Sequence, residues 1–127
     1  MHNLRQRLTR EQQGFTLIEL LVVIIILGIL LAIAIPSYLS FRDRANKSAA
    51  QANVRAAVPG MEAFNADHST GYTGATLTKL QGSYDAGIKN IKISVANSTT
   101  YCIVNTSPGT VFYHKSGPGA DIKPGNC

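Results

Sequence analysis

One carboxylate, Glu19, lies within an otherwise almost entirely aliphatic stretch that runs for 21 residues from Phe15 to Ile35. An acidic side chain costs about 2.5–3.5 kcal/mol at the centre of a membrane helix, and less near an interface, so it needs a partner. The stretch contains no basic residue. Cleavage between Gly14 and Phe15 would create a charged α-amino group, and in a staggered stack of helices Glu19 of one subunit could pair with that amine on the next. The pattern therefore predicts processing followed by assembly, with Glu19 unpaired before the cut.

The apolar stretch is long enough to cross a membrane. At 1.5 Å per residue a helix over it would span about 31 Å, the thickness of a bilayer core. Residues 1–14 are polar, and three arginines against Glu11 give them a charge of 3 − 1 = +2. Because positive charge precedes the stretch, we expect the N-terminus to stay in the cytoplasm and the C-terminal part to lie outside.

The next segment, residues 37–68, is rich in alanine and predicted to continue the helix. Its larger apolar residues recur at spacings of three and four and so share one face, from which Arg55 and Glu62 are excluded: Val54, Val58, Met61 and Phe64. One helix is then expected from Phe15 to about Asp67. Pro36 and Pro59 are predicted to kink it, and Pro59 could instead end it.

Residues 69–127 change to a composition rich in Gly, Ser, Thr and Asn. Alternating apolar residues predict three strands in an antiparallel meander, Ile91–Val95, Thr100–Asn105 and Val111–Lys115. The tail from Gly117 is expected to form no regular element. The fold class is therefore α+β: a long kinked N-terminal helix, with a membrane-spanning first half over residues 15–36, packed by its second half on a small sheet.

Cys102 and Cys127 are the two cysteines of the chain. They could be free thiols, but the expected topology places both outside the cytoplasm, where disulfides persist. Paired, they would close a loop of about 26 residues and tie the tail down over the sheet. We therefore expect a disulfide that compensates for a small core.

The N-terminal pattern resembles that of the type IV pilin and pseudopilin family. The resemblance rests on the basic leader 1–14, the Gly14-Phe15 junction, Thr16-Leu-Ile-Glu19 and the aliphatic run to Pro36, and it is close over residues 10–60. It implies that a membrane aspartyl prepilin peptidase cuts after Gly14 and N-methylates Phe15. Phe15, Thr16 and Glu19 would then serve assembly, and the helix would loosen between Gly28 and Pro36.

The resemblance also implies the protein's partners and location. The precursor would sit in the cytoplasmic membrane, and an assembly platform with its ATPases would build the mature subunits into an extracellular filament. Such a pilus could serve adhesion, twitching motility or DNA uptake. A pseudopilin of a secretion or competence system is the alternative within the family, and a monomeric membrane-anchored binding module is the alternative outside it.

Other interpretations have weaker support. Ala32-Ile-Ala34 could be a signal-peptidase site, but Pro36 would be the second residue after the cut and Glu19 would stay unexplained. Without the leader the net charge falls from +5 to 9 − 6 = +3, and Lys89 with Lys92 is the nearest approach to a concentrated basic patch, which gives no strong nucleic-acid signal.

Scattered residues could in principle carry other chemistry. No metal site or cofactor is expected from the three histidines, His2, His68 and His114. The same holds for the carboxylates that could be imagined as calcium ligands, Asp67, Asp85 and Asp121. The helical aromatics, for which electron transfer could be imagined, are more simply packing residues: Tyr38, Phe41 and Phe64. Three asparagines fit the Asn-x-Ser/Thr glycosylation pattern, which is common by chance: Asn46, Asn97 and Asn105. No nucleophile–base pair or phosphate loop is present, so no enzymatic activity is expected.

Overall fold

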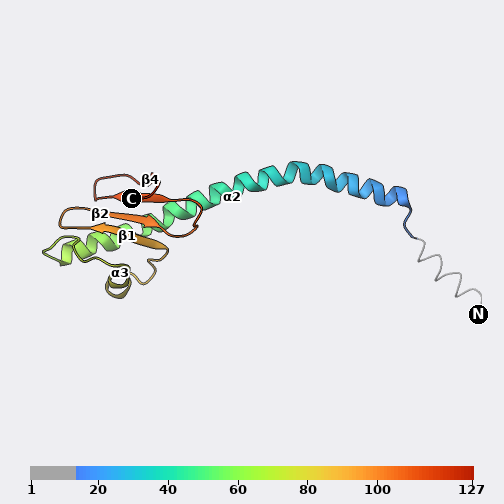
Figure 1. The fold of residues 1–127 in the computed structure, drawn as a ribbon. Coiled ribbons are helices and arrows are strands. Elements are labelled where there is room, and N and C mark those ends of the chain that lie inside the picture. Colours follow the sequence, from blue (N-terminus) through green and yellow to red (C-terminus); the bar gives the residue numbers. More distant parts are fainter. Residues whose placement is uncertain (1–13) are drawn as a thin grey trace, which may run out of the picture. The chain divides into compact units, whose positions relative to one another are not determined.

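The computed structural model describes residues 14–127, so the predicted leader, apart from Gly14, lies outside the described residues. The elements in chain order are α2 (Leu17–Asp67), α3 (Leu77–Ser83), β1 (Ile91–Ala96), β2 (Tyr101–Asn105), β3 (Tyr113–Ser116) and β4 (Lys123–Pro124) (Figure 1). The chain divides into two units, with the second running from Arg42 to Cys127 and the first preceding it. A long N-terminal helix and a small antiparallel sheet confirm the predicted α+β class.

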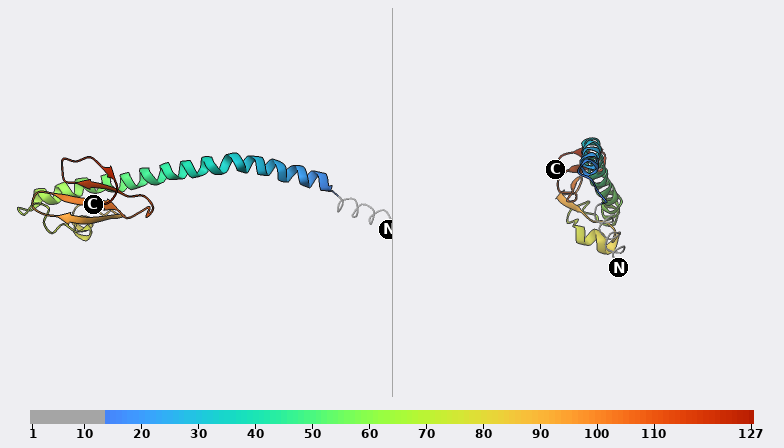
Figure 2. Two further views of the ribbon diagram at one scale, coloured as in Figure 1. Left: turned by 45° about the horizontal axis from the view of Figure 1, so that its top comes forward. Right: turned by 90° about the vertical axis from the view of Figure 1, so that its right-hand side faces the viewer.

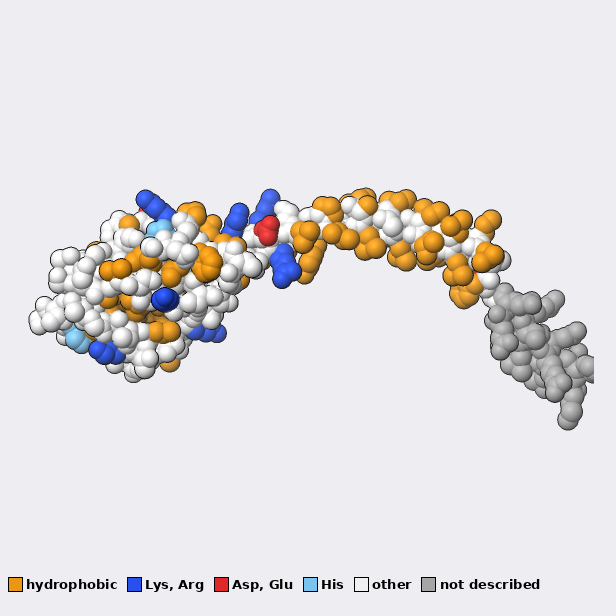
Figure 3. Space-filling model, viewed as in Figure 1, with side chains coloured by type: hydrophobic (Ala, Val, Ile, Leu, Met, Phe, Trp, Pro, Cys, Tyr) orange, Lys and Arg blue, Asp and Glu red, His pale blue; other side chains and the backbone are white. Residues whose placement is uncertain are grey.

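In the first unit α2 presents apolar side chains on all sides. Their exposed fractions range from 49% at Val22 to 89% at Leu17, and orange side chains line this part of the helix in Figure 3, with white backbone between them. Among the described residues α2 is the one helix long and apolar enough to cross a membrane, judged by length and composition. A helix that is apolar all round requires an apolar environment, either lipid or other protein surfaces.

The helix continues through both prolines. Because α2 ends at Asp67, the expectation that Pro59 might end the helix is wrong. The turns around Pro59 are retained because Val54, Met61 and Phe64 are buried on the same face of the helix. Kinks at Pro36 and Pro59, and flexibility at Gly28, stay predictions.

The sheet is antiparallel throughout, in the order β1-β2-β3-β4. The three predicted strands are confirmed, with the third shifted to Tyr113–Ser116. The expectation that the tail forms no regular element is wrong, because His114 pairs with Lys123 in β4. Gly125 N–H donates to Phe112 O at 2.8 Å and holds the end of this pairing.

The short helix α3 was not predicted from the sequence. Thr76 caps it, with its hydroxyl oxygen accepting from Lys79 N–H at 3.3 Å. The following chain packs closely on α2 at Gly60, where a Cβ atom would lie 2.6 Å from Ile88 Cδ1. Glycine at position 60 therefore lets the segment between α3 and β1 reach the helix.

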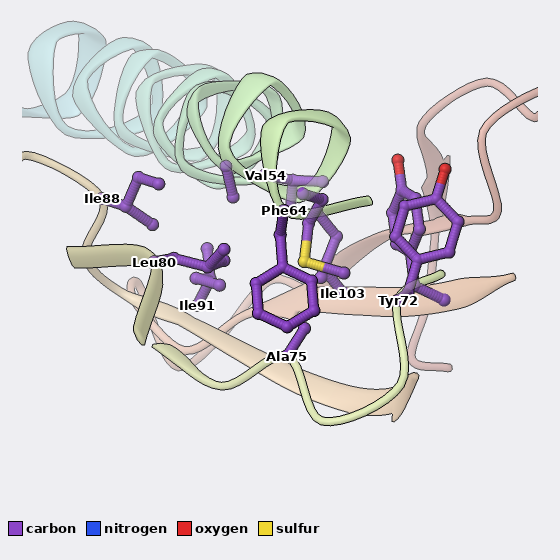
Figure 4. Close-up of a cluster of buried hydrophobic side chains, with 11 residues drawn as sticks. Val54, Phe64, Tyr72, Ala75, Leu80, Ile88, Ile91 and Ile103 are labelled. Carbon is purple, nitrogen blue, oxygen red and sulfur yellow. The ribbon is translucent and has the colours of Figure 1, made fainter. Parts of the chain in front are cut away.

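The core lies between the second half of α2 and the sheet, as the close-up in Figure 4 and the two views of Figure 2 show. The predicted face of α2 is confirmed, with Val54, Met61 and Phe64 buried and Val58 partly buried. Strand β2 is buried at all five positions. Its inward side chains, Tyr101 and Ile103, belong to the core.

The tail covers the other face of β2. Cys102 and Cys127 form the expected disulfide, with their Cα atoms 5.9 Å apart. The Lys115 ammonium group donates to Ala120 O and so ties the chain before β4 to β3. Asn105, only 1% exposed, fixes the β2–β3 loop by donating to Val111 O at 2.8 Å and accepting from Tyr113 N–H at 2.7 Å.

Removing the disulfide is expected to destabilise the second unit. A closed loop of this length contributes roughly 3–4 kcal/mol on the chain-entropy model. We expect the double variant Cys102→Ser/Cys127→Ser to have a free energy of unfolding that is lower by that amount. Urea unfolding of the full chain in detergent, followed by near-ultraviolet circular dichroism, measures the difference. Free thiols in the folded wild-type protein would contradict the bond.

Tyr101 offers a second test of the core. Its ring is 1% exposed, and its hydroxyl has no hydrogen-bond partner among residues 14–127. Burial, with the nearby Glu62 carboxylate, raises the pKa of Tyr101 above the usual 10.0. The folded state then holds the hydroxyl proton of Tyr101 more tightly than the unfolded state does. The stability that this difference contributes is therefore lost as pH rises above about 10.

Tyr101→Phe is therefore expected to raise the free energy of unfolding by about 1 kcal/mol at neutral pH. It should also reduce the loss of stability at alkaline pH. Tyr72→Phe is the matched control, because the Tyr72 hydroxyl donates to Glu62 at 3.1 Å and its removal should destabilise. Urea unfolding at about pH 7 and about pH 11 measures both effects. A Tyr101→Phe variant less stable than wild type would show that the hydroxyl is satisfied.

Candidate functional site

The start of α2 is organised by Thr16 and Glu19. Thr16 Oγ1 accepts from Glu19 N–H at 3.2 Å, and Glu19 Oε2 accepts from Thr16 N–H at 3.2 Å. This reciprocal pair is a capping box, and it satisfies two of the backbone donors left free at a helix N-terminus. The positive end of the helix dipole also favours a carboxylate in the first turn.

The capping box gives Glu19 a hydrogen-bond partner that was not expected from the sequence, while its lack of a charged partner before cleavage stays a prediction. Its carboxylate already accepts a hydrogen bond from the chain that contains it. The Thr-x-x-Glu spacing before an apolar run is the sequence signature of this contact. The capping box therefore lowers the free-energy cost of placing the Glu19 carboxylate in an apolar helix, and it does so without a second subunit.

A backbone donor does not neutralise the charge. Residues 14–41 contain no Lys, Arg or His, so a cationic partner for Glu19 has to come from another part of the chain or from another molecule. A carboxylate can accept several hydrogen bonds, so capping leaves capacity for an amine. Glu19 also lies in a shallow apolar hollow lined by Phe15, Ile18 and Val22 among others, which gives a partner a defined place to approach.

The other predicted residues lie apart from this helix start. Gly28 and Pro36 are on the exposed part of α2 in the first unit, whereas Pro59 and the Cys102–Cys127 disulfide belong to the second. A side chain at Gly28 would meet no atom within 4 Å, so packing within the chain does not explain this glycine. The structure thus brings together Thr16 with Glu19 and Cys102 with Cys127, and leaves the helix breakers separate.

Residues considered for other chemistry have structural roles. Asp67 accepts from the Tyr84 hydroxyl at 2.8 Å, and Asp85 accepts from Gly87 N–H at 2.8 Å. Phe64 is part of the core, as predicted, whereas Tyr38 and Phe41 are exposed in the chain and their role as packing residues stays a prediction. Asn105 has a buried amide used in loop hydrogen bonds, which excludes it as a glycosylation site in the folded protein. Within residues 14–127 no three His, Cys, Asp or Glu side chains gather as a metal site would require.

Comparisons with known proteins decide the family. Residues 9–35 match the family described as the prokaryotic N-terminal methylation motif, a match that includes the Gly14-Phe15 junction and Glu19. The type IV wide pilus major component PilA4 of Thermus thermophilus is 36% identical over 107 residues, 82% of this chain and 81% of the relative. The chain belongs to the type IV pilin family.

Two further relatives in this family align over shorter parts. The type IV major pilin PilA of Myxococcus xanthus is 43% identical over 58 residues, which is 46% of this chain and 26% of that protein. The type II secretion system core protein G of Pseudomonas aeruginosa is 39% identical over 59 residues, 46% of this chain and 42% of that protein. No solved structure matches the chain. The resemblance inferred from the N-terminal residues is confirmed.

Two substitutions of Glu19 separate its capping role from its charge. Glu19→Gln retains an oxygen that can accept from Thr16 N–H, whereas Glu19→Ala removes both the cap and the charge. If a cationic amine must pair with Glu19 during assembly, both variants should be processed normally but should assemble poorly. We expect the filament yield to fall at least about tenfold, because a loss of about 1.4 kcal/mol per contact already gives a factor of ten.

The measurement is the amount of processed chain in sheared filaments relative to membranes. Thr16→Ser keeps the capping hydroxyl and serves as the control. Wild-type filament yield from Glu19→Gln would show that the cap, and not the charge, is what assembly requires.

Proposed function

We propose that this chain is the structural subunit of a type IV pilus filament. The observation that carries the proposal is the apolar part of α2, whose most hydrophobic 18-residue window has no residue buried within the chain. Apolar area on this scale is unstable in water. The bilayer can cover it in the precursor, and neighbouring helices can cover it in a filament.

Processing connects these two states. A prepilin peptidase cuts between Gly14 and Phe15 and methylates the new amine, as the match to the methylation motif supports. The amine on Phe15 then meets Glu19 of a neighbouring subunit, in an environment that otherwise has no cation on residues 14–41. Phe15 is 80% exposed and Glu19 borders the same hollow, so neither needs a rearrangement of the chain to reach a neighbour.

Location and partners follow from the same proposal. The precursor spans the cytoplasmic membrane with its N-terminus inside, and the second unit lies on the far side, where the Cys102–Cys127 bond is stable. An assembly platform in the inner membrane, driven by ATPases, lifts processed subunits into the extracellular filament. Contacts between copies of this chain make the filament, while the sheet and tail of the second unit face outward.

A pseudopilin of a secretion system is the second candidate, favoured by the similarity to the type II secretion system core protein G. That alignment covers 46% of this chain, whereas the alignment with the wide pilus component covers 82%. The longer alignment includes most of the second unit and favours the pilus. A monomeric membrane anchor is less satisfactory, because it gives Glu19 no cationic partner.

Mass spectrometry of filaments sheared from cells tests the proposal. We expect the sheared fraction to contain this chain with an intact mass corresponding to residues 15–127, one methyl group and one disulfide. Membranes from a strain without the peptidase should hold the uncut form and yield no filaments. A mature chain that begins at Ile35, or absence of the chain from all sheared filaments, would overturn the proposal.

A further inference from the structure

The second half of α2 has an exposed ridge with differently charged surfaces on either side. Successive residues of a helix are turned by about 100°, so Pro59 lies opposite the buried face made by Val54, Ala57 and Met61. Pro59 is exposed, and it lines hollows on both sides of this ridge. The two hollows belong to the second unit, and each is formed where α2 meets a different segment of the chain.

The first hollow lies between α2 and the chain before β4, and we call it the basic groove. Its volume is about 520 Å³, and its lining residues are Gln51, Arg55, Val58, Pro59, Lys115, Ala120, Asp121 and Ile122. Two cations against Asp121 give it a charge of 2 − 1 = +1. Arg55 is exposed on the helix, and Val58 and Ile122 supply a half-buried apolar floor.

The second hollow lies between α2 and the end of α3, and we call it, together with the neighbouring Asp67, the acidic edge. Its volume is about 430 Å³, and it is lined by Pro59, Gly60, Ala63, Ser83, Tyr84 and Asp85. None of these residues is basic. Tyr84 joins the two carboxylates, because its hydroxyl donates to Asp67 Oδ2 while Asp85 follows it in the chain.

The contact with Asp67 also defines the electrostatics of the acidic edge. Burial, the hydrogen bond and the charge of Asp67 all raise the pKa of Tyr84, so the phenol stays a neutral donor. The edge therefore presents two exposed carboxylates beside an aromatic ring. A partner that offers an exposed guanidinium and an apolar floor complements it in charge and chemistry.

We propose that the exposed carboxylates of the acidic edge of one subunit, Asp67 and Asp85, dock into the basic groove of the next copy of this chain. The inference rests on the proposed filament function and adds the surface that joins neighbouring second units. Every copy carries both surfaces on the two sides of one helix, so the contact is head-to-tail. A contact between two different surfaces can repeat from copy to copy, and it builds an open filament when its rotation does not close into a ring.

Charge reversal tests the pairing. Arg55→Glu and Asp85→Lys are each expected to lower the amount of chain in sheared filaments at least fivefold, and the double variant is expected to restore it to within twofold of wild type. Lys89→Glu makes the same charge change at an exposed position that lines neither surface, and it should assemble normally.

Carbodiimide coupling, which joins lysine to carboxylates, provides a direct readout. In filaments of the R55K variant, peptides containing position 55 or Lys115 should be coupled to peptides containing Asp67 or Asp85, and this coupling should vanish in detergent-dissociated subunits. Normal yield from both reversals, a double variant no better than its parents, or coupling that persists in dissociated subunits would overturn the contact. In the first two cases wild-type filaments still contain the chain, so the proposed function stands.

Discussion

A helix that is apolar on every side has no stable place in water, and this constraint governs the chain. Over the first unit, the side chains of α2 are at least about half exposed, with no core of their own to cover them. The cost of that surface grows with its area, and only lipid or similar helices can remove it. Membrane residence before processing and helix packing afterwards are two solutions to the same problem, and a single stretch of sequence serves both.

The second half of α2 meets a different condition. There the apolar residues are confined to one face, and the sheet, α3 and the intervening loop cover that face. The resulting core is small, with a main cluster of eleven buried residues. Additional constraints are concentrated on the outer side of β2, where the disulfide, the short strand β4 and the hydrogen bonds of Lys115 and Asn105 hold the tail and the β2–β3 loop. These constraints keep the outward surface of the second unit ordered.

Glu19 connects helix formation to assembly. In the chain itself it closes a capping box with Thr16, which organises the first turn of α2. A carboxylate held in this way is also positioned to receive an amine. In the proposed function the same residue stabilises the helix end before and after cleavage, and it recognises a neighbour only afterwards, because cleavage would create the amine.

The sequence by itself determined the long helix, the buried face of its second half, three of the four strands, the disulfide and the family. These features depend on periodicity, on spacing within a few residues, or on a pattern as unusual as a carboxylate in an apolar run. Tertiary structure decided the rest. β4 pairs with β3, where His114 is opposite Lys123. The helix continues through the exposed Pro59 because the opposite face of these turns, with Val54, Met61 and Phe64, is buried. A side chain at position 60 would meet Ile88, which is 28 residues away in the sequence. Each of these depends on contacts between segments distant in sequence, whose energies no local pattern records. The basic groove and the acidic edge also depend on tertiary structure, because Lys115 and Asp85 lie beside α2 only when the chain is folded.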